Sequence, residues 1–414
     1  MVTKSIGPQI RCQICNNPKL SLVLSLGHQP VLQEYLTEEN LQEPEGTYPL
    51  NLVFCSVCGL SQLDYIIDPK LVFMPHYPYR TGLTQMLVRN FDSLAQTMHE
   101  AGHYKKGELV VDIGSNDGTL LQQFKKRGAK VVGIEPTNVA KIANKRGIPT
   151  IQHYFNAGTV RDIQKKYGIP RVITATNVFA HINDTPELVR NIKALMGTKT
   201  VFVSESQYLR DMVEKFAFDT IYNEHLRYYS LKPMMHLFAQ HKMSVIDAER
   251  IEAAGGSIRV YVKKGTHPVS ARAKKLLAEE KKLGLHDLKT LHSFAERAHD
   301  AKHDFVALLI KLKKTGARIV GITSAGRSNA LLGFTKINNT LLDYNAEKKG
   351  SPKIGMYTPG THILVVDEQR LIQDQPEYAV VLSWHIGDEL MKKTRAAGYK
   401  GKFVLPLPVA RVVR

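Results

Sequence analysis

Long apolar runs are missing from this sequence, and the absence narrows the class of protein. No stretch approaches the roughly 20 apolar residues that a helix needs to cross a bilayer. The amino-terminal MVTKSIGPQIRC has a lysine but lacks the apolar core of a secretory signal. We therefore expect a soluble, cytoplasmic protein with no membrane partner.

Low-complexity segments and evident internal repeats are also missing, and acidic residues are in the minority. The 414 residues predict two or three globular domains, because one core rarely covers such a length. The net charge of +18 could indicate nucleic-acid binding, but the basic residues are dispersed in pairs and triplets such as Lys125-Lys126-Arg127. Without a basic stripe interleaved with aromatics, we expect no nucleic-acid partner and only a general attraction for anionic small molecules.

Cysteine is scarce, and its placement is informative. The only four form two Cys-x-x-Cys pairs, Cys12 with Cys15 and Cys55 with Cys58. Two such pairs can supply four thiolates to one tetrahedral zinc ion, and full thiolate ligation predicts a structural role. A redox pair or unligated thiols remain alternatives. Short apolar runs broken by Gly and Pro predict a small β-rich module around them, over residues 1–75.

The segment 109–121, LVVDIGSNDGTLL, has the order strand, small-residue loop, helix. Gly114 and Gly118 would let the backbone turn tightly and approach a ligand. The spacing differs from the three-glycine dinucleotide fingerprint and lacks the Gly-Lys-Ser/Thr ending of a P-loop. The loop predicts a site for a nucleotide-like cofactor, with an ordinary strand-to-helix turn as the alternative.

Strands and helices alternate from residue 108, which predicts an α/β fold with a mainly parallel, doubly wound sheet. Ligands of such sheets bind at the carboxyl ends of the strands. Asn177 and His181 follow one predicted strand, and Glu205 and Ser206 follow the next, so we expect all four side chains to face the cofactor crevice. Two further strands around Gly255-Gly256 predict an antiparallel edge that closes the sheet.

The segment 216–230, FAFDTIYNEHLRYYS, places Tyr222, Glu224 and His225 within four residues. A phenol, a carboxylate and an imidazole together suit proton abstraction. A buried polar network at a domain junction is an equally good interpretation of the residues alone.

Residues 268–315 predict a long, charged, helical connector with a break at Gly284, followed by a second α/β pattern. In that pattern, RIVGITSAGRSNALLGF again predicts a strand, a small-residue loop and a helix. The helix start with Arg327 beside it could hold a phosphate, or the loop could be a structural turn.

These motifs occur in the order found in a known family. The two cysteine pairs, YPYRTG, VDIGSNDG, GIEP, NVFAHIND, DTIYNEHLRYYS, GGSIR and the carboxy-terminal loop resemble the three-domain, S-adenosylmethionine-dependent sugar C-methyltransferases that build branched deoxysugars. The resemblance covers nearly the whole chain. It implies an α/β protein with a zinc-binding module (1–75), a class I methyltransferase Rossmann-like domain (76–266) and a second Rossmann-like domain that helps to bind a sugar nucleotide (267–414).

The resemblance implies methyl transfer to carbon 3 of a nucleotide-diphosphate-linked 4-keto-6-deoxy sugar. It places His225, Tyr222, Glu224, His181 and Tyr77 in the catalytic site, with His225 as the expected base and Tyr222 as its rival. It implies cofactor contacts from Asp112, Gly114, Ser115, Asn116, Asp117, Gly118, Glu135 and Asn177, with the Glu135 carboxylate on the ribose. Substrate contacts are expected from Tyr79, Glu205, Ser324, Arg327 and Asn329. An O- or N-methyltransferase, or a binding protein without turnover, would fit the same fold.

Two departures from the family pattern bear on these roles. Asn223 stands where the family usually has the first histidine of His-Glu-His, which favours His225 as the base. Gly326-Arg327-Ser328 replaces the family's common Ala-Lys-Gly, while Asn329 is retained. Arginine keeps the charge in a planar fork, so pyrophosphate contact remains expected while the nucleotide stays open.

Overall fold

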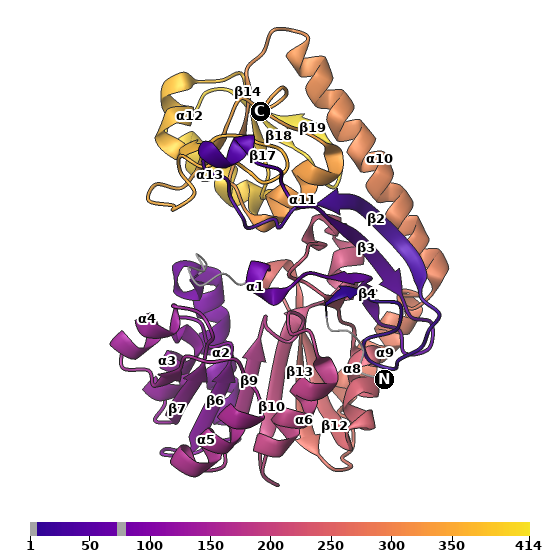
Figure 1. Cartoon of the computed structure of the whole chain (residues 1–414), viewed down its shortest axis with the longest axis vertical. Coiled ribbons are helices and arrows are strands. Elements are labelled where there is room, and N and C mark those ends of the chain that lie inside the picture. The colour runs from indigo at the N-terminus through magenta and orange to yellow at the C-terminus, as the bar shows by residue number, and fades with distance from the viewer. Residues whose placement is uncertain (1–5, 73–79) are drawn as a thin grey trace.

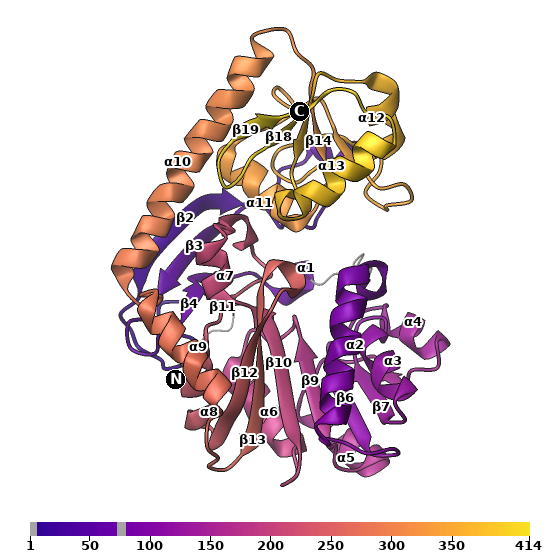
Figure 2. The same cartoon turned by 180° about the vertical axis from the view of Figure 1, so that it is seen from behind.

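The computed structural model describes residues 6–72 and 80–414 and consists of two α/β lobes joined along one side (Figure 1). The long helix α10 (Leu288–Lys313) runs along that side from one lobe to the other, next to a small antiparallel sheet (Figure 2). No helix within the described ranges combines the length and apolar character that a membrane span requires.

The first lobe is built on a seven-stranded sheet with the order β12-β13-β10-β9-β6-β7-β8. Its strands are β6 (Leu109–Ile113), β7 (Lys130–Ile134), β8 (Thr150–Ile151), β9 (Val172–Thr176), β10 (Val201–Gln207), β12 (Met243–Ile251) and β13 (Ser257–Lys264). Its helices are α2 (Gln85–Glu100), α3 (Thr119–Lys126), α4 (Ala140–Lys145), α5 (Ala157–Tyr167), α6 (Thr185–Leu195), α7 (Leu209–Glu214) and α8 (Leu231–Gln240). The strands from β6 to β10 pair in parallel, and β13 and β12 are antiparallel, so the predicted sheet and its closing edge are confirmed.

The strands of this sheet read as continuous apolar runs because helices cover both of its faces. Every residue of β6 and β9 is buried, including Asp112 and Thr174. Burial of both faces is typical of parallel sheets and explains why these segments do not alternate between apolar and polar residues. Exposed polar residues of the sheet lie at its periphery, such as Lys130 at the start of β7 and Arg250 on the edge strand β12.

The second lobe contains a six-stranded sheet with the order β16-β15-β14-β17-β18-β19, as the second α/β pattern predicts. Its strands are β14 (Ile319–Ile322), β15 (Asn345–Glu347), β16 (Val365–Asp367), β17 (Tyr378–Val381), β18 (Lys402–Leu405) and β19 (Arg411–Val413). Its helices are α11 (Gly326–Thr335), α12 (Glu368–Asp374) and α13 (Gly387–Ala396). The first five strands in this order are parallel, and β19 closes the edge antiparallel to β18.

The amino-terminal module is β-rich, as predicted, but it is not self-contained. Its elements are β1 (Gly7–Pro8), β2 (Ser21–Gln29), β3 (Tyr48–Phe54), β4 (Ser61–Leu63), β5 (Tyr65–Ile66) and α1 (Pro69–Val72). The four-stranded sheet has the order β11-β4-β3-β2, and β11 (Arg227–Tyr228) comes from the segment that carries Tyr222 and His225. The module therefore pairs directly with the first lobe.

The connector between the lobes is helical, with a break at the predicted glycine. Helix α9 (Ala271–Lys282) ends just before Gly284, which has a φ of +64°. A left-handed residue at this place is common after a helix, and glycine adopts it without a steric penalty. Helix α10 then packs on β2 and α11, so it holds the second lobe and the amino-terminal module together.

Candidate active site and zinc centre

A large cavity of about 1110 Å³ lies between the lobes and is lined by loops from both. The first lobe contributes the loops after β6, β7 and β9, and the second contributes those after β14, β15 and β17. All six loops leave the carboxyl ends of parallel strands, where α/β sheets bind ligands. Pockets for one drug-sized ligand measure about 300 to 1,000 Å³, so this cavity has room for a cofactor and a substrate together.

The loop after β6 approaches the cavity closely at Gly114. Its φ of +70° is left-handed, and a Cβ at this position would lie 2.4 Å from a methyl carbon of Val178. Glycine is therefore required both by conformation and by space. The close approach leaves the backbone of Gly114, Ser115 and Asn116 on the cavity wall, as expected for a cofactor loop.

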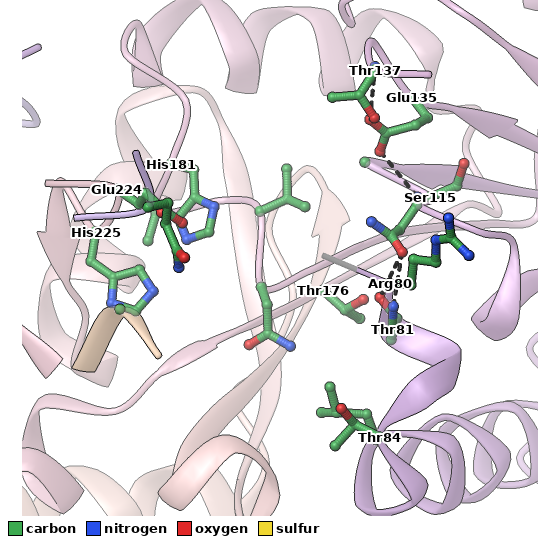
Figure 3. A pocket seen from close by; sticks show the side chains of 18 of the residues that line it. Arg80, Thr81, Thr84, Ser115, Glu135, Thr137, Thr176, His181, Glu224 and His225 are labelled. Atoms are coloured by element: carbon green, nitrogen blue, oxygen red, sulfur yellow. Dashed lines mark hydrogen bonds between the residues drawn. The ribbon is translucent and has the colours of Figure 1, made fainter. Parts of the chain in front are cut away.

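Glu135 stands at the end of β7 and faces the same cavity (Figure 3). One carboxylate oxygen accepts a bond of 3.1 Å from the backbone N–H of Asn116. The other accepts bonds from the N–H and the hydroxyl of Thr137, at 2.9 and 2.7 Å. An ionised carboxylate has about four acceptor positions, so these contacts orient Glu135 and leave capacity for a ligand hydroxyl.

Asp112 also lines the cavity, at the buried end of β6. Burial raises the pKa of its carboxyl to about 7, and the negative charges of Glu135 and Glu205 contribute to the increase. The hydrogen bond of 2.7 Å from the Thr174 hydroxyl has the opposite effect and lowers the pKa. A carboxyl that can be neutral or charged near pH 7 is characteristic of ligand sites.

His181 and His225 stack on the opposite side of the cavity from Glu135, with ring centroids 5.0 Å apart (Figure 3). The Tyr222 ring lies 4.1 Å from that of His225. His225 Nδ1 lies 3.1 Å from the carbonyl oxygen of Thr220. Since a carbonyl can only accept, Nδ1 carries the proton and Nε2 is left as an acceptor.

Both histidines are held neutral. Burial lowers the pKa of His225 to about 4. The positive charge of Arg327 lowers this pKa further, whereas the hydrogen bond to the Thr220 carbonyl raises it. Burial lowers the pKa of His181 well below its usual value, with added repulsion from His225 and Arg227. At neutral pH the pair can therefore accept a proton, which is the chemistry that a general base requires.

Arg227 is a residue that the sequence analysis did not single out. It is buried, and its guanidinium donates to the backbone oxygens of Ile182 and Asn183 at 2.7 and 2.6 Å. The N–H of Leu226 donates to the carbonyl of Ala180 at 3.1 Å. Leu226 and Arg227, the two residues after His225, are thus hydrogen-bonded to the residues on either side of His181. In the sequence, Arg227 is simply an arginine two residues after His225, and nothing there distinguishes it from a surface arginine.

Arg327 lines the cavity from the second lobe, as its predicted phosphate role requires, but its guanidinium is already paired. It donates twice to Asp219 of the first lobe, at 3.1 and 2.9 Å, and Trp384 Nε1 donates to the same carboxylate at 2.9 Å. Gly326, the first residue of α11, also lines the cavity, and a Cβ added there would lie 3.8 Å from a ring carbon of Tyr222. These contacts bring the second lobe against the tyrosine and histidine cluster.

The structure gives Glu205 a different place from the one predicted. Strand β10 continues to Gln207, so Glu205 lies inside the strand, where its carboxylate pairs with Arg259 at 2.6 Å and accepts from Asn90 at 2.8 Å. The next two residues, Ser206 and Gln207, line the cavity, whereas Glu205 does not. Glu205 is therefore withdrawn as a substrate contact.

Four residues that were predicted to contact a ligand do not line the cavity: Asp117, Gly118, Ser324 and Asn329. The polar side chains among them stabilise the loops after β6 and β14. Asp117 accepts from the Thr119 hydroxyl at 2.6 Å and pairs with Arg146 at 3.0 Å, which stabilises the start of α3. Asn329 donates to Leu32 and to the Tyr35 hydroxyl, and the same hydroxyl bonds Ser324. These side chains hold the two loops in shape, so direct contact with a ligand is not supported for them.

The remaining predicted residues fall into two groups. Tyr77 and Tyr79 lie outside the described residues. The cavity brings together Asp112, Gly114, Ser115, Asn116, Glu135, Asn177, His181, Tyr222, Glu224, His225 and Arg327.

The four cysteines meet in one cluster with all Sγ atoms within 4.8 Å of one another. Cys12 and Cys58 are 3.5 Å apart, as are Cys15 and Cys55. A tetrahedral zinc ion with bonds of about 2.3 Å separates its sulfur ligands by about 3.8 Å, so the residues fit this ion. The hydrogen bond between Cys12 and Cys58 lowers the pKa of the Cys12 thiol and raises that of the Cys58 thiol, as expected for two thiols that share one proton. With four protein ligands the centre is structural.

Family models match three consecutive parts of the chain. Residues 12–73 match a model described as "Putative zinc binding domain", residues 86–247 a "Methyltransferase domain", and residues 252–408 a "C-methyltransferase C-terminal domain".

Curated relatives agree with these matches. The C-methyltransferase NovU of Streptomyces niveus is 28% identical over 412 residues, which cover 99% of this chain and 98% of the relative. A ubiquinone biosynthesis O-methyltransferase of Rhodopseudomonas palustris (strain BisB5) is 30% identical over 92 residues, which cover 22% of this chain and 36% of that protein.

Solved structures resemble part of the chain. Magnesium protoporphyrin IX methyltransferase from Synechocystis PCC 6803 with bound SAM has a TM-score of 0.33 and 11% identity, over 44% of this chain and 81% of its own. The plantazolicin methyltransferase BpumL in complex with SAH has a TM-score of 0.33 and 15% identity, over 44% and 84%. The order of the three family models and the full-length match to NovU show that the chain is similar to the C-methyltransferases and is an S-adenosylmethionine-dependent methyltransferase with a zinc-binding domain.

Proposed function

We propose that this enzyme acts in the cytoplasm on a nucleotide-diphosphate-linked 4-keto-6-deoxy sugar and methylates its carbon 3. The observation that carries the proposal is the neutral His225, whose protonated Nδ1 is held by Thr220 in a cavity shared by both lobes. A base in this state suits a carbon acid, because the ketone of such a sugar makes the neighbouring C–H acidic. The first lobe would then bind the ketone of the sugar, and the second lobe would bind the nucleotide.

In this proposal His225 Nε2 takes the proton from carbon 3, and the electron pair of the broken C–H bond passes into an enediolate. The charge that develops on the substrate oxygen needs hydrogen-bond donors, and Tyr222 is a candidate because its ring lies 4.1 Å from that of His225. Glu224 lines the same wall and can balance the imidazolium that forms. The bound cofactor supplies an electrophilic methyl group. Arg227 and Thr220 hold the two histidines in place while the proton moves.

The substrate class is tested by incubation with methyl-labelled S-adenosylmethionine and a panel of thymidine- and guanosine-linked 4-keto-6-deoxy sugars. We expect NMR of the product to show the label on carbon 3 for at least one member of the panel. Label on an oxygen or nitrogen, or no transfer to any keto sugar while the cofactor binds, would contradict the proposal.

The base is tested by His225→Asn, which keeps a polar side chain with an N–H donor but removes the basic nitrogen. General-base catalysis contributes about 100- to 10,000-fold, so we expect a loss of that order in kcat with little change in cofactor affinity by calorimetry. His236→Asn is the matched control, because this half-buried histidine lies on α8 and bonds Gln240 instead. Full activity in His225→Asn would exclude His225 as the base.

A further inference from the structure

We propose that Glu347 binds the 3′-hydroxyl of the substrate's nucleoside, so that the second lobe holds the nucleotide as the first lobe holds the cofactor. This inference rests on the proposed function, and it names a residue and a ligand group that the family motifs do not include. It follows from three observations: the strand order, the hydrogen bonds of the carboxylate and the charges beside it.

The strand order places Glu347 where Rossmann-like folds put their ribose-binding acid. In the second lobe, β15 lies beside the central strand β14, and Glu347 is the last residue of β15. In the first lobe, β7 lies beside the central strand β6, and Glu135 follows the last residue of β7. An acid at the end of this second strand hydrogen-bonds ribose hydroxyls in dinucleotide-binding folds.

The two carboxylates are held in the same way. One oxygen of Glu347 accepts a bond of 2.8 Å from the N–H of Ser324, in the loop after β14. Its other oxygen accepts a bond of 3.0 Å from the N–H of Lys348, the next residue. In Glu135 the corresponding donors are the N–H of Asn116, in the loop after β6, and that of Thr137. Glu135 and Glu347 therefore have similar hydrogen bonds and both line the shared cavity, which indicates that both carboxylates bind a ligand hydroxyl.

Glu347 also has the capacity and the surroundings for this ligand. It is half-buried on the cavity wall, and each oxygen accepts one backbone N–H out of about two possible bonds. Lys348 and Lys349 follow it, line the cavity and are exposed, so they can neutralise a diphosphate. A lone structural carboxylate would not need cationic side chains facing the same space.

The arrangement fixes the direction of the ligand. The nucleoside would lie over β15 at Glu347, and the diphosphate would pass the start of α11 at Gly326. The hexose would then reach the first lobe, because Gly326 and Tyr222 line the same cavity and a Cβ added to Gly326 would lie 3.8 Å from the Tyr222 ring. A nucleotide in this direction delivers its sugar to His225.

Calorimetry on the full-length protein tests the assignment with TDP, UDP and GDP, followed by the 3′-deoxy counterpart of whichever binds most tightly. In the wild type we expect loss of the 3′-hydroxyl to weaken binding by about 10-fold or more, because a hydrogen bond to a charged group is lost. In Glu347→Ala the two ligands should bind almost equally. A role for Glu347 in shaping the loop alone would weaken both ligands by the same factor, so the difference isolates the contact.

Glu377→Gln is the matched control, since this carboxylate in the same lobe also accepts a backbone N–H, from Arg318, but is exposed at the start of β17. It should keep the full 3′-hydroxyl effect. Cofactor affinity should be unchanged in both variants, which also reports that the chain is folded. If Glu347→Ala retains the 3′-hydroxyl effect, the inference is wrong while the proposed function stands. If no nucleoside diphosphate binds the wild type, the proposed substrate class fails and the inference with it.

Discussion

At the scale of residues, the site depends on keeping an imidazole neutral where a proton must be accepted. Burial depresses the pKa of His225, and the Thr220 carbonyl fixes which nitrogen is free. The guanidinium of Arg327 adds to the depression, yet Asp219 pairs with it at 2.9 Å. A bound enediolate would reverse this balance, because its negative charge favours the imidazolium that forms during the reaction.

The pH dependence of kcat/KM reports this state of His225. An ordinary histidine has a pKa of about 6.5, whereas burial lowers the pKa of His225 to about 4, so its basic form persists to lower pH. We expect the acid limb of kcat/KM to follow a pKa near 4, with no loss of activity between pH 7 and pH 5.5 over the range in which circular dichroism shows folded protein. An acid limb centred at pH 6 to 7 in folded protein that persists in Asp112→Asn, which removes the cavity carboxyl with a pKa of about 7, would show that His225 is not the titrating base.

Residue types were easier to predict than residue positions. The cluster of Tyr222, Glu224 and His225 was readable because its members are adjacent in sequence and share one loop. Glu205 was misplaced because the end of β10 cannot be located to the residue from the sequence, and because its partners Arg259 and Asn90 come from distant segments. Arg227 was missed because its partners are backbone carbonyls, which leave no trace in the sequence.

At the scale of elements, the unit β6, loop and α3 brings backbone to the cofactor without a side chain in between. Its glycines carry the left-handed conformations, and Asp117 bonds the first turn of α3 from behind. The sequence predicts this unit because every part of it is local. It does not predict that β11 joins the amino-terminal sheet, since such pairing is set by tertiary contacts between distant segments.

Gly114→Ala tests the close approach, with Gly102→Ala as the matched control. Both glycines have a positive φ, of +70° and +67°, so each variant should lose about 1 kcal/mol of unfolding free energy in urea titrations from backbone strain, and Gly114→Ala should lose more because its Cβ clashes with Val178. Only Gly114 has a neighbour, the Val178 methyl, within 2.4 Å of the added Cβ, whereas Gly102 has none within 4 Å. We expect Gly114→Ala alone to lose at least 10-fold in cofactor affinity by calorimetry. Equal affinities in the two variants would argue against this loop as the cofactor site.

At the scale of the whole molecule, the zinc-binding module bridges the two lobes. Cys12, Cys55 and Cys58 pack into a core shared with the first lobe, whereas Leu24 and Phe54 pack into one shared with the second. The metal therefore supports the cavity between the lobes without touching it. The cysteine pairs predicted the metal, but they could not predict this bridging position, which depends on how the four-stranded sheet packs.

Zinc removal should destabilise both lobes at once. We expect metal analysis to find about one zinc per chain, and we expect chelation or Cys58→Ser to lower the melting temperature by at least several degrees, since metal binding is coupled to folding. Ser56→Ala is the control, because Ser56 is exposed in the same Cys-x-x-Cys turn. Protein that was never exposed to chelators and yet contains no zinc would contradict the assignment.

The central claim is that a carbon, not a heteroatom, loses a proton to His225 and receives the methyl group. The most direct test uses a nucleotide-linked 4-keto-6-deoxy sugar that carries deuterium at carbon 3, with NMR and mass spectrometry of the product. We predict that the product gains a methyl group at carbon 3 and loses the deuterium, and that His225→Asn stops both changes. A methylated product that retains deuterium at carbon 3 would contradict the account.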